Sequence, residues 1–480
     1  MSNSIYWYDY ETFGIDPKFD RLAQFAGLRT DEELNVIDDP LVMYCKPADD
    51  MLPDPYACMV TGITPQKAAA DGLIESEFIA AIHQEFATPG TCVAGYNNIR
   101  FDDEFTRHTL YRNFYNAYAH EWQHGNSRWD IIDMVRLTRA LRPDGIEWPV
   151  TEKGKPSNRL ELLTEANGIS HEAAHDAMSD VYATIAVARL IRDKQPRLYD
   201  YIYKLRKKDR VRSLLNLRSR DAVLHVSSKY SMQRHSIAMV MPLCGHPTNK
   251  NGVIVYDLAK DPSQFISSDI DEVAGSIFTP ASELPEGIHR VPLKTVHVNK
   301  CPVIVPLKTM DDTAAERLGI DVSQCLANRD TLLQHIEQLA GKTSQVFSQQ
   351  EFPVIIDPDA QLYSGGFFTD ADADRMRQIQ TTPPNELANL KLSYDDARIP
   401  EMLFRYRARN FPATLDDDSR GDWDAYRKIK FTEPEHGGRT FNQVEASIEE
   451  LRISPEITGS QLAVLDELES YLKNLKSGIL

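Results

Sequence analysis

Strand-like and helix-like patterns of hydrophobic residues alternate along the first 195 residues of the chain. Short apolar runs bounded by turn residues predict strands, and apolar positions three and four residues apart predict helices. The predicted strands cover residues 4–9, 22–30, 41–46 and 91–96. The predicted helices cover residues 75–86, 102–115, 131–141 and 176–194. This order predicts an α/β domain over residues 1–196 that begins with hairpins.

The pattern changes after Pro196. From residue 222 to about residue 306, short β-rich runs are separated by turn residues, which predicts a small barrel or sandwich. Beyond Asp311 helical spacing returns and continues toward the C-terminus. We therefore expect a β-rich domain with a helical extension over residues 197–350 and a helical domain over residues 351–480.

Length and composition agree with a multidomain globular protein. The 480 residues correspond to roughly three domains of about 150 residues each, and 42% hydrophobic residues are enough for a sizeable core. No apolar run is long enough to span a bilayer, and acids come too early for a signal peptide, so we expect a cytoplasmic protein. The six cysteines are scattered, without the spacing of zinc ligands, which favours reduced thiols.

The charge of the chain restricts how it can bind nucleic acid. A formal charge of −18 argues against a protein that binds nucleic acid over its whole surface, because phosphate neutralisation needs clustered Lys and Arg. Residues 204–220 are the exception, since they form the densest basic run in the chain. This run is either a solvated helix end or linker, or part of a local basic groove.

The first strand-like run ends in two acids separated by one residue. In an extended segment, residues i and i+2 point to the same face, so Asp9 and Glu11 can present two carboxylates side by side. Such a pair can bind a divalent cation, or it can be a solvated strand end. The motif alone does not decide between these interpretations.

Two further acidic clusters occur in the same predicted domain. Asp102 lies where a strand gives way to a helix, and Asp180 lies near the start of the helix that follows His175. Acids in the first turn of a helix are also expected for capping and for the helix dipole. Taken together, however, the clusters match two-metal phosphodiester hydrolysis, in which carboxylates hold two cations about 3.5 to 4 Å apart. Oxygen ligands favour Mg²⁺, and Mn²⁺ is a possible substitute.

The motifs resemble those of the DEDDh branch of the DnaQ-like 3′-to-5′ exonucleases. The matching segments are Asp9-Tyr-Glu11, Asn97-Asn-Ile-Arg-Phe101-Asp102 and His175-x4-Asp180. Other segments are similar to bacterial exonuclease I along nearly the whole chain, among them residues 126–130, 296–302, 359–363 and 406–412. The resemblance implies an α/β fold with an RNase H-like exonuclease domain and mixed sheet, a small SH3-like β-rich domain and a C-terminal helical domain.

The resemblance also implies an activity. Single-stranded DNA would be degraded processively from its 3′ end, with release of 5′-mononucleotides and a role in DNA repair and recombination. Asp9, Glu11, Asp102 and Asp180 would hold two Mg²⁺ ions, and His175 would act as general base, a role that suits a pKa near neutrality. A single-stranded-DNA-binding protein would be a partner through its acidic tail. We expect a monomer and no membrane partner.

Two of these motif positions have an alternative residue nearby. His171 and Asp176 also fit the spacing His-x4-Asp, but the acid would then stand at the first helical position, where an acid is expected regardless. Asp102 is preferred over Asp103 because it directly follows Phe101, as in the family.

Preference for single strands would come from a basic channel with aromatic side chains on which bases stack. The candidates in the exonuclease domain are Phe13, Arg100 and Trp129, and residues 204–220 and 405–409 are candidates to line a path between domains. The alternative for all of them is a structural role, as core aromatics or as salt bridges at the rim.

Three other functions fit parts of the pattern. A 3′-to-5′ exoribonuclease would use the same acids, because the motifs do not read the sugar. A phosphatase with an aspartate nucleophile usually has Asp-x-Asp, whereas the second acid here is Glu11. A non-catalytic adaptor on the same fold is expected to lack a metal ligand, and none is missing. One departure from the family lies outside the motifs, in a loop at residues 364–367 that is one residue longer than expected.

Overall fold

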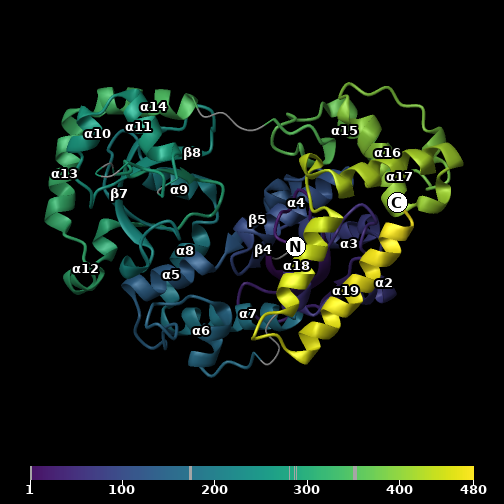
Figure 1. Cartoon of the computed structure of the whole chain (residues 1–480). Coiled ribbons are helices and arrows are strands. Elements are labelled where there is room, and N and C mark those ends of the chain that lie inside the picture. Colours follow the sequence, from purple (N-terminus) through teal and green to yellow (C-terminus); the bar gives the residue numbers. More distant parts are fainter. Residues whose placement is uncertain are drawn as a thin grey trace. The chain divides into compact units, whose positions relative to one another are not determined.

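The computed structural model describes residues 3–171, 176–280, 282–285, 287, 289–349 and 354–479. The chain divides into two compact units, which are described separately. Unit 1 comprises Met1–Ser127, His171–Tyr182 and Val354–Leu480, and unit 2 comprises Arg128–Ser170 and Ala183–Pro353. Each unit therefore combines segments that are far apart in the sequence (Figure 1).

A five-stranded mixed sheet in the order β3-β2-β1-β4-β5 contains the N-terminal strand. Its strands are β1 (Ser4–Thr12), β2 (Leu22–Thr30), β3 (Leu41–Tyr44), β4 (Thr91–Gly95) and β5 (Ser127–Asp130). β1 pairs antiparallel with β2 and parallel with β4, so it lies in the interior of the sheet. Its aromatic and β-branched residues suit a strand that is buried on both faces.

Helices from both ends of the chain surround this sheet in unit 1. In the N-terminal part these are α1 (Pro55–Thr61), α2 (Pro65–Asp71), α3 (Glu75–Ala87), α4 (Asp102–Arg112) and the start of α7 (Ala177–Lys194). In the C-terminal part these are α15 (Asp370–Thr381), α16 (Arg398–Asn410), α17 (Asp417–Thr432), α18 (Phe441–Arg452) and α19 (Gly459–Ser477). Capping boxes begin the last two helices, with Thr440 and Gln443 at α18 and Thr458 and Gln461 at α19.

The last two helices complete a hydrophobic core that begins near the N-terminus. Phe13 and Leu52 pack in one cluster with Phe441 of α18 and with Leu465 and Leu468 of α19. Figure 1 shows these two yellow helices beside the purple and blue N-terminal elements. The N-terminal part of unit 1 therefore does not bury its own apolar surface without the end of the chain.

Buried ion pairs join the same two parts of the chain. The carboxylate of Asp50 is fully buried, and it lies 2.8 Å from Arg409 and 3.1 Å from Lys430. Burial alone would raise the pKa of Asp50, but Arg409, Lys430 and Arg21 hold it well below its usual range. Removing one partner of such a group leaves a buried charge uncompensated, which typically costs about 3–5 kcal/mol.

Unit 2 is built on an antiparallel sheet in the order β10-β6-β7-β8-β9. Its strands are β6 (Val223–Val226), β7 (Ile237–Gly245), β8 (Gly252–Asp257), β9 (Leu293–His297) and β10 (Ile304–Pro306). Its helices are α5 (Ile132–Leu141), α6 (Leu160–Ala166), α8 (Pro196–Lys204), α9 (Lys208–Leu214), α10 (Ser263–Ser267), α11 (Ile270–Phe278), α12 (Asp312–Leu318), α13 (Val322–Gln334) and α14 (Ile336–Ser348), together with most of α7. Among the described residues, no helix combines the length and the apolar character needed to cross a membrane.

The β-rich segment contains two helices that the apolar pattern did not predict. Both α10 and α11 lie between β8 and β9, and a capping box formed by Asp269 and Glu272 begins α11. α11 and β7 both pack against α14, so the insertion is part of the unit's core.

The shared core of unit 1 leads to a prediction for stability. Leu468 is fully buried in that core, so we expect Leu468→Ala to lower the free energy of unfolding by about 2–5 kcal/mol, measured by urea denaturation. Ile453, at the end of α18, is 82% exposed, and the matched variant Ile453→Ala should change it by less than about 0.5 kcal/mol. Equal losses in the two variants would contradict the shared core.

Candidate active site

β1 places Asp9 and Glu11 on one face of the first sheet. Tyr6, Tyr8 and Tyr10 belong to a cluster of buried aromatic rings on the opposite face. Glu11 is 8% exposed, and Asp9 is the only residue of the strand that is not classed as buried. The aromatic side chains on one face of β1 therefore pack in the core. Because side chains alternate along a strand, both acids point to the opposite face.

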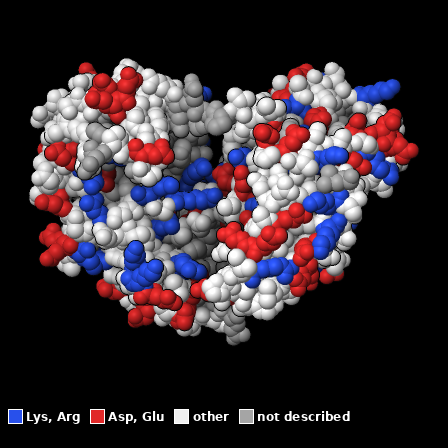
Figure 2. Space-filling view, viewed as in Figure 1, with Lys and Arg blue, Asp and Glu red and all other residues white. Residues whose placement is uncertain are grey.

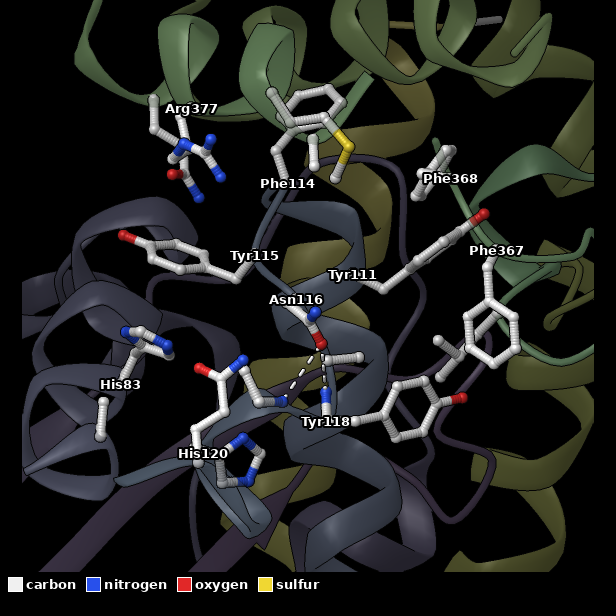
Figure 3. Close-up of a pocket in the computed structure, with 18 of the residues that line it drawn as sticks. His83, Tyr111, Phe114, Tyr115, Asn116, Tyr118, His120, Phe367, Phe368 and Arg377 are labelled. Atoms are coloured by element: carbon white, nitrogen blue, oxygen red, sulfur yellow. Dashed lines mark hydrogen bonds between the residues drawn. The ribbon is translucent and has the colours of Figure 1, made fainter. Parts of the chain in front are cut away.

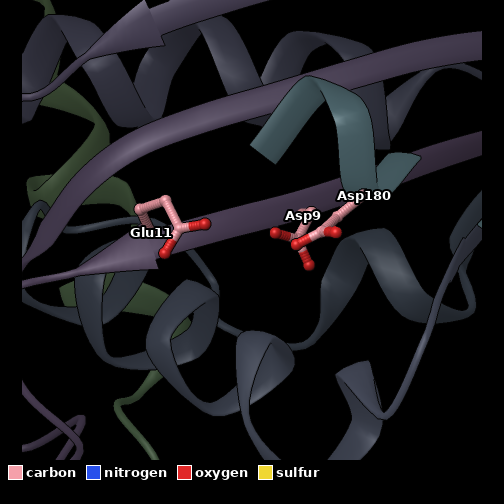
Figure 4. A group of neighbouring side chains, drawn as sticks. All are labelled: Asp9, Glu11 and Asp180. Atoms are coloured by element: carbon pink, nitrogen blue, oxygen red, sulfur yellow. The ribbon is translucent and has the colours of Figure 1, made fainter. Parts of the chain in front are cut away.

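Asp180 brings a third carboxylate to this face. It lies in the first turn of α7. One carboxylate oxygen from each of Asp9, Glu11 and Asp180 can be chosen so that the three atoms lie within 4.8 Å of one another. Figure 4 shows the carboxylates of Asp9 and Asp180 close together, with Glu11 farther along the same strand. Three oxygen donors gathered in this way can surround a divalent cation.

Asp102 lies at the start of α4, after a tight turn from β4. Asn97 adopts a left-handed backbone conformation with φ of 66°, which Asn tolerates better than most residues, and a short 3₁₀ turn from Asn98 to Arg100 follows. Asp102 is only 5% exposed. After burial itself, its charge is the largest cause that raises the pKa of Asp9, so it lies within electrostatic reach of the other acids.

The acids destabilise one another's charged forms. Burial, followed by repulsion from Asp102, holds the pKa of Asp9 well above its usual range. Burial, followed by repulsion from Asp180, raises the pKa of Glu11 to about 9. Bound cations would neutralise the negative charge of the cluster while the carboxylates stay ionised and act as ligands. Protonation would also neutralise this charge, but a protonated carboxyl group is a poor metal ligand. Both the donor atoms and the electrostatics of the site therefore fit divalent metal ions.

The neighbour of Asp102 has a different role. The hydroxyl of Tyr8 donates a hydrogen bond of 2.5 Å to Asp103 Oδ1, and Tyr8 points to the aromatic face of the sheet. Glu104 accepts hydrogen bonds from Arg107 and from Tyr363. Asp103 and Glu104 therefore bind side chains that hold α4 in place. This agrees with the choice of Asp102 as the acid of the site.

The segment before α7 contains two histidines. His171 Nε2 lies 2.5 Å from Asp180 Oδ1, and the His171 side chain is 5% exposed. His175, the predicted general base, lies outside the described residues. The sequence suggested His171 only as a partner of Asp176, so its contact with Asp180 was not predicted. His171 and Asp180 are nine residues apart, on either side of the start of α7, and this spacing matches no known motif.

The rings of two of the three candidate DNA contacts are enclosed in the structure. Phe13 is fully buried in the core that α18 and α19 complete. Trp129 is 1% exposed and packs edge-to-face against Tyr199 and Tyr203. A ring enclosed in this way offers no face to a nucleobase. Arg100 is exposed in the turn before α4 and remains a candidate.

Two basic residues of the cluster at residues 405–409 have structural roles. Arg405 and Arg409 are buried and form ion pairs with Asp359, at 3.2 Å for Arg405, while Arg409 also pairs with Asp50. Their charges are neutralised within unit 1, so the structural alternative holds for both.

The basic run at residues 204–220 does lie on the surface of unit 2. It covers the end of α8 and all of α9, and its exposed basic side chains are Lys204, Lys207, Lys208, Arg210, Arg212 and Arg218. Figure 2 shows Lys and Arg gathered over the region of α8. This surface has the charge that a phosphate backbone requires.

Similarity to known proteins extends over nearly the whole chain. Residues 6–188 match the exonuclease family, residues 206–349 match the exonuclease I SH3-like domain, and residues 356–475 match the exonuclease I C-terminal domain. Exodeoxyribonuclease I of Escherichia coli is 48% identical over 433 residues, which is 90% of each chain. Exodeoxyribonuclease I of Haemophilus influenzae is 44% identical over 470 residues, which is 98% of each chain.

Solved structures agree with the family matches. A moderately thermophilic exonuclease I from Methylocaldum szegediense is 52% identical with a TM-score of 0.95, covering 98% of this chain and 99% of that one. A zinc-bound complex of E. coli exonuclease I with single-stranded DNA is 44% identical with a TM-score of 0.94, covering 99% and 100%. A structure of SSB and exonuclease I with an inhibitor is 43% identical with a TM-score of 0.91, covering 99% and 100%. These matches confirm the predicted fold class and the resemblance.

The raised pKa values lead to a prediction for cation binding. Because the pKa of Glu11 is about 9 in the folded protein and near 4.5 when unfolded, the metal-free fold should lose stability as the pH rises between these values. The gain in Tm from a divalent cation should therefore grow with pH, from near zero at about pH 5 to roughly 3–5 °C at a hundredfold excess over Kd.

Thermal melts with Mg²⁺ or with EDTA, from pH 5 to pH 8.5, measure this gain. Glu11→Gln removes one of the repelling charges, so this variant should melt higher than the parent in EDTA and gain less from the cation. A gain that does not vary with pH would contradict the assigned electrostatics.

Proposed function

The chain belongs to the exonuclease I family, and from this we propose that it hydrolyses single-stranded DNA processively from the 3′ end and releases 5′-mononucleotides. The observation that carries the proposal is the cluster of carboxylates formed by Asp9, Glu11 and Asp180, with Asp102 beside them. Such a cluster is costly to fold and becomes useful when it binds cations next to a phosphodiester. A role in DNA repair and recombination follows from the activity.

Asp9, Glu11, Asp102 and Asp180 would hold two Mg²⁺ ions, and Mn²⁺ could substitute for them. When bound, the two ions would activate the attacking water and stabilise the leaving 3′ oxygen. Mg²⁺ is proposed because all four ligands are carboxylates, whereas sites selective for zinc usually include His or Cys.

Two histidines in the segment before α7 would have separate roles, one in proton transfer and one in the orientation of Asp180. His175 takes a proton from the attacking water as its oxygen bonds to phosphorus and the bond from phosphorus to the 3′ oxygen breaks. His171, 2.5 Å from Asp180, orients that carboxylate toward the cluster. The assignment of His175 rests on its place in the His-x4-Asp motif.

Three domains would take part in the proposed reaction. They cover residues 1–196, 197–350 and 351–480. The three family matches support these boundaries because each match falls within one of the ranges. The basic surface of α8 and α9 would bind the phosphate backbone, with an affinity that falls steeply as salt rises.

The expected protein partner is a single-stranded-DNA-binding protein. The structure that contains SSB with a related exonuclease I supports this assignment. Exposed Lys and Arg on unit 2 would accept its acidic tail. A reducing location, the cytoplasm, agrees with the six cysteines, all of which are described and are in the reduced form.

Digestion of end-labelled strands tests the proposed activity. Single-stranded DNA should shorten from its 3′ end only with a divalent cation, and duplex DNA and RNA of the same sequence should be poor substrates. Asp180→Ala should reduce the rate by at least about a thousandfold, whereas Asp71→Ala, which removes an exposed acid at the end of α2, should not. RNA degraded as fast as DNA would favour an exoribonuclease, and substantial activity in Asp180→Ala would refute the metal assignment.

The two histidines can be separated by their effects on the pH dependence of kcat. His175→Ala should lower kcat by about 10²–10⁴-fold and remove the acidic limb of the pH profile, because the base is lost. His171→Ala should lower kcat less and keep the shape of the profile, because the variant loses only the contact that orients Asp180. If the acidic limb disappears in His171→Ala instead, the roles of the two residues are reversed.

A further inference from the structure

The C-terminal part of unit 1 approaches the N-terminal part in two different ways. Around the end of α4 the two parts leave an open cavity of about 500 Å³, and Figure 3 shows aromatic side chains of residues 111–118 and 367–368 facing it. Near the end of β1, in contrast, residues 437–439 pack directly on the β1–β2 loop, which comprises residues 13–21. The second contact therefore involves the loop that directly follows two of the proposed metal ligands.

Regular pairing between β1 and β2 ends at the second acid of β1. Glu11 lies opposite Gln24 and Thr12 opposite Leu22, so the register shifts by one residue between them. Such irregularities bend a strand and redirect the side chains beside them. The orientation of Glu11 therefore depends on the β1–β2 loop as well as on the hydrogen bonds of the sheet.

The carboxylate of Asp20 fills the centre of this loop. Asp20 is 2% exposed, and its Oδ2 accepts a hydrogen bond of 2.9 Å from the backbone N–H of Asp16. The same oxygen lies against Gly14, where a Cβ would be only 2.2 Å away from it. The main chain of the loop thus encloses a buried negative charge, and such a charge requires a cation beside it.

Arg439, in the segment before α18, supplies that cation. Its guanidinium donates to both carboxylate oxygens of Asp20, and its Nη2 also lies 2.8 Å from Asp54 Oδ2. Asp54 caps α1 and donates its backbone N–H to the carbonyl oxygen of Phe13 at 2.8 Å, so it holds the start of the β1–β2 loop. Burial raises the pKa of Asp20, although the hydrogen bond and the charge of Arg439 act to lower it. One side chain of the C-terminal part therefore contacts both groups that hold the loop.

The turn before Arg439 fits closely over the loop. Gly437 has φ of +77°, a conformation that L side chains rarely adopt, and a Cβ there would lie 2.3 Å from the ring of Phe19. The glycine therefore lets the turn approach Phe19, and this approach brings Arg439 within reach of Asp20.

We propose that Arg439 is a positioning residue of the active site. By pairing with Asp20 and Asp54 it fixes the β1–β2 loop, and the loop in turn holds Glu11 in the orientation that binds a cation. This role rests on the proposed function, in which Glu11 is a metal ligand. Loss of a group that orients a metal ligand typically lowers metal affinity or activity by about 10–100-fold, and because Arg439 acts through the loop we expect a loss near the lower end of that range.

Binding of Mn²⁺ in the absence of DNA, followed by the EPR signal of the free ion, tests this role. Arg439→Gln leaves the Asp20 carboxylate buried without its cation, so Mn²⁺ should bind about tenfold more weakly than to the parent protein. With single-stranded DNA and subsaturating Mg²⁺, the apparent kcat should also fall about tenfold, while KM for the strand stays within about twofold. Arg452→Gln is the matched control, because Arg452 is also partly buried and pairs with Asp466 and Glu469 on α19, so it should change neither quantity.

Removal of the buried charge should restore the site. In the double variant that combines Asp20→Asn with Arg439→Gln no unpaired carboxylate remains in the loop, so the affinity for Mn²⁺ should return to within about threefold of the parent value. A rise in KM without recovery in the double variant would show instead that Arg439 contacts a DNA phosphate, and would overturn the proposal. Unchanged Mn²⁺ affinity in Arg439→Gln would overturn it as well.

Thermal melts of the variants separate a local effect from loss of the fold. Arg439→Gln should melt lower than the parent protein but remain folded at the assay temperature. If it does not fold, Arg439→Lys replaces it, because an ammonium group can neutralise Asp20 but lacks the planar fork that bridges it to Asp54. Mn²⁺ should then bind more weakly to Arg439→Lys than to the parent protein, and equal affinities would overturn the proposal.

Hydrolysis of single-stranded DNA by the parent protein is measured separately from cation binding. If the parent protein binds Mn²⁺ and the variants show the expected order of affinities while no DNA is hydrolysed, the proposed activity is wrong and the positioning role of Arg439 stands.

Discussion

Mutual repulsion between closely spaced carboxylates is the constraint on which this protein's architecture depends. Asp9, Glu11 and Asp180 hold oxygen atoms within 4.8 Å of one another, at a partly buried site where water screens their charges less than at the surface. The repulsion between these carboxylates opposes folding, so other contacts must supply the stabilising free energy. The aromatic face of β1, the hydrogen bond from Tyr8 to Asp103 and the core behind Phe13 all provide it.

Local periodicity explains why part of the site was predictable from sequence. The alternation of a strand is enough to place Asp9 and Glu11 on one face, and the choice of Asp180 followed from the resemblance to the family's His-x4-Asp motif. The contact of His171 with Asp180 was not predictable, because it depends on how the chain approaches α7 and not on any repeat. The same holds for α10 and α11, whose short apolar pattern lies inside a β-rich segment.

Residue type alone was a poor guide to which aromatic and basic residues face a ligand. Phe13 and Trp129 have the chemistry of stacking platforms, but neighbours from other segments enclose both rings. Arg405 and Arg409 have the chemistry of phosphate binding, yet they neutralise the buried Asp359, which lies about fifty residues away. Such partners are brought together only by tertiary folding, and a single sequence does not pair them.

The dependence of the N-terminal core on α18 and α19 has a consequence for synthesis of the protein. Asp9 and Glu11 are among the first residues to be synthesised. Phe13, two residues after Glu11, packs in a core that is completed only by leucines of α19. A nascent chain thus carries the acids of a nuclease long before it can hold them in place. We therefore expect the core next to the acids to close only after α18 and α19 have been synthesised.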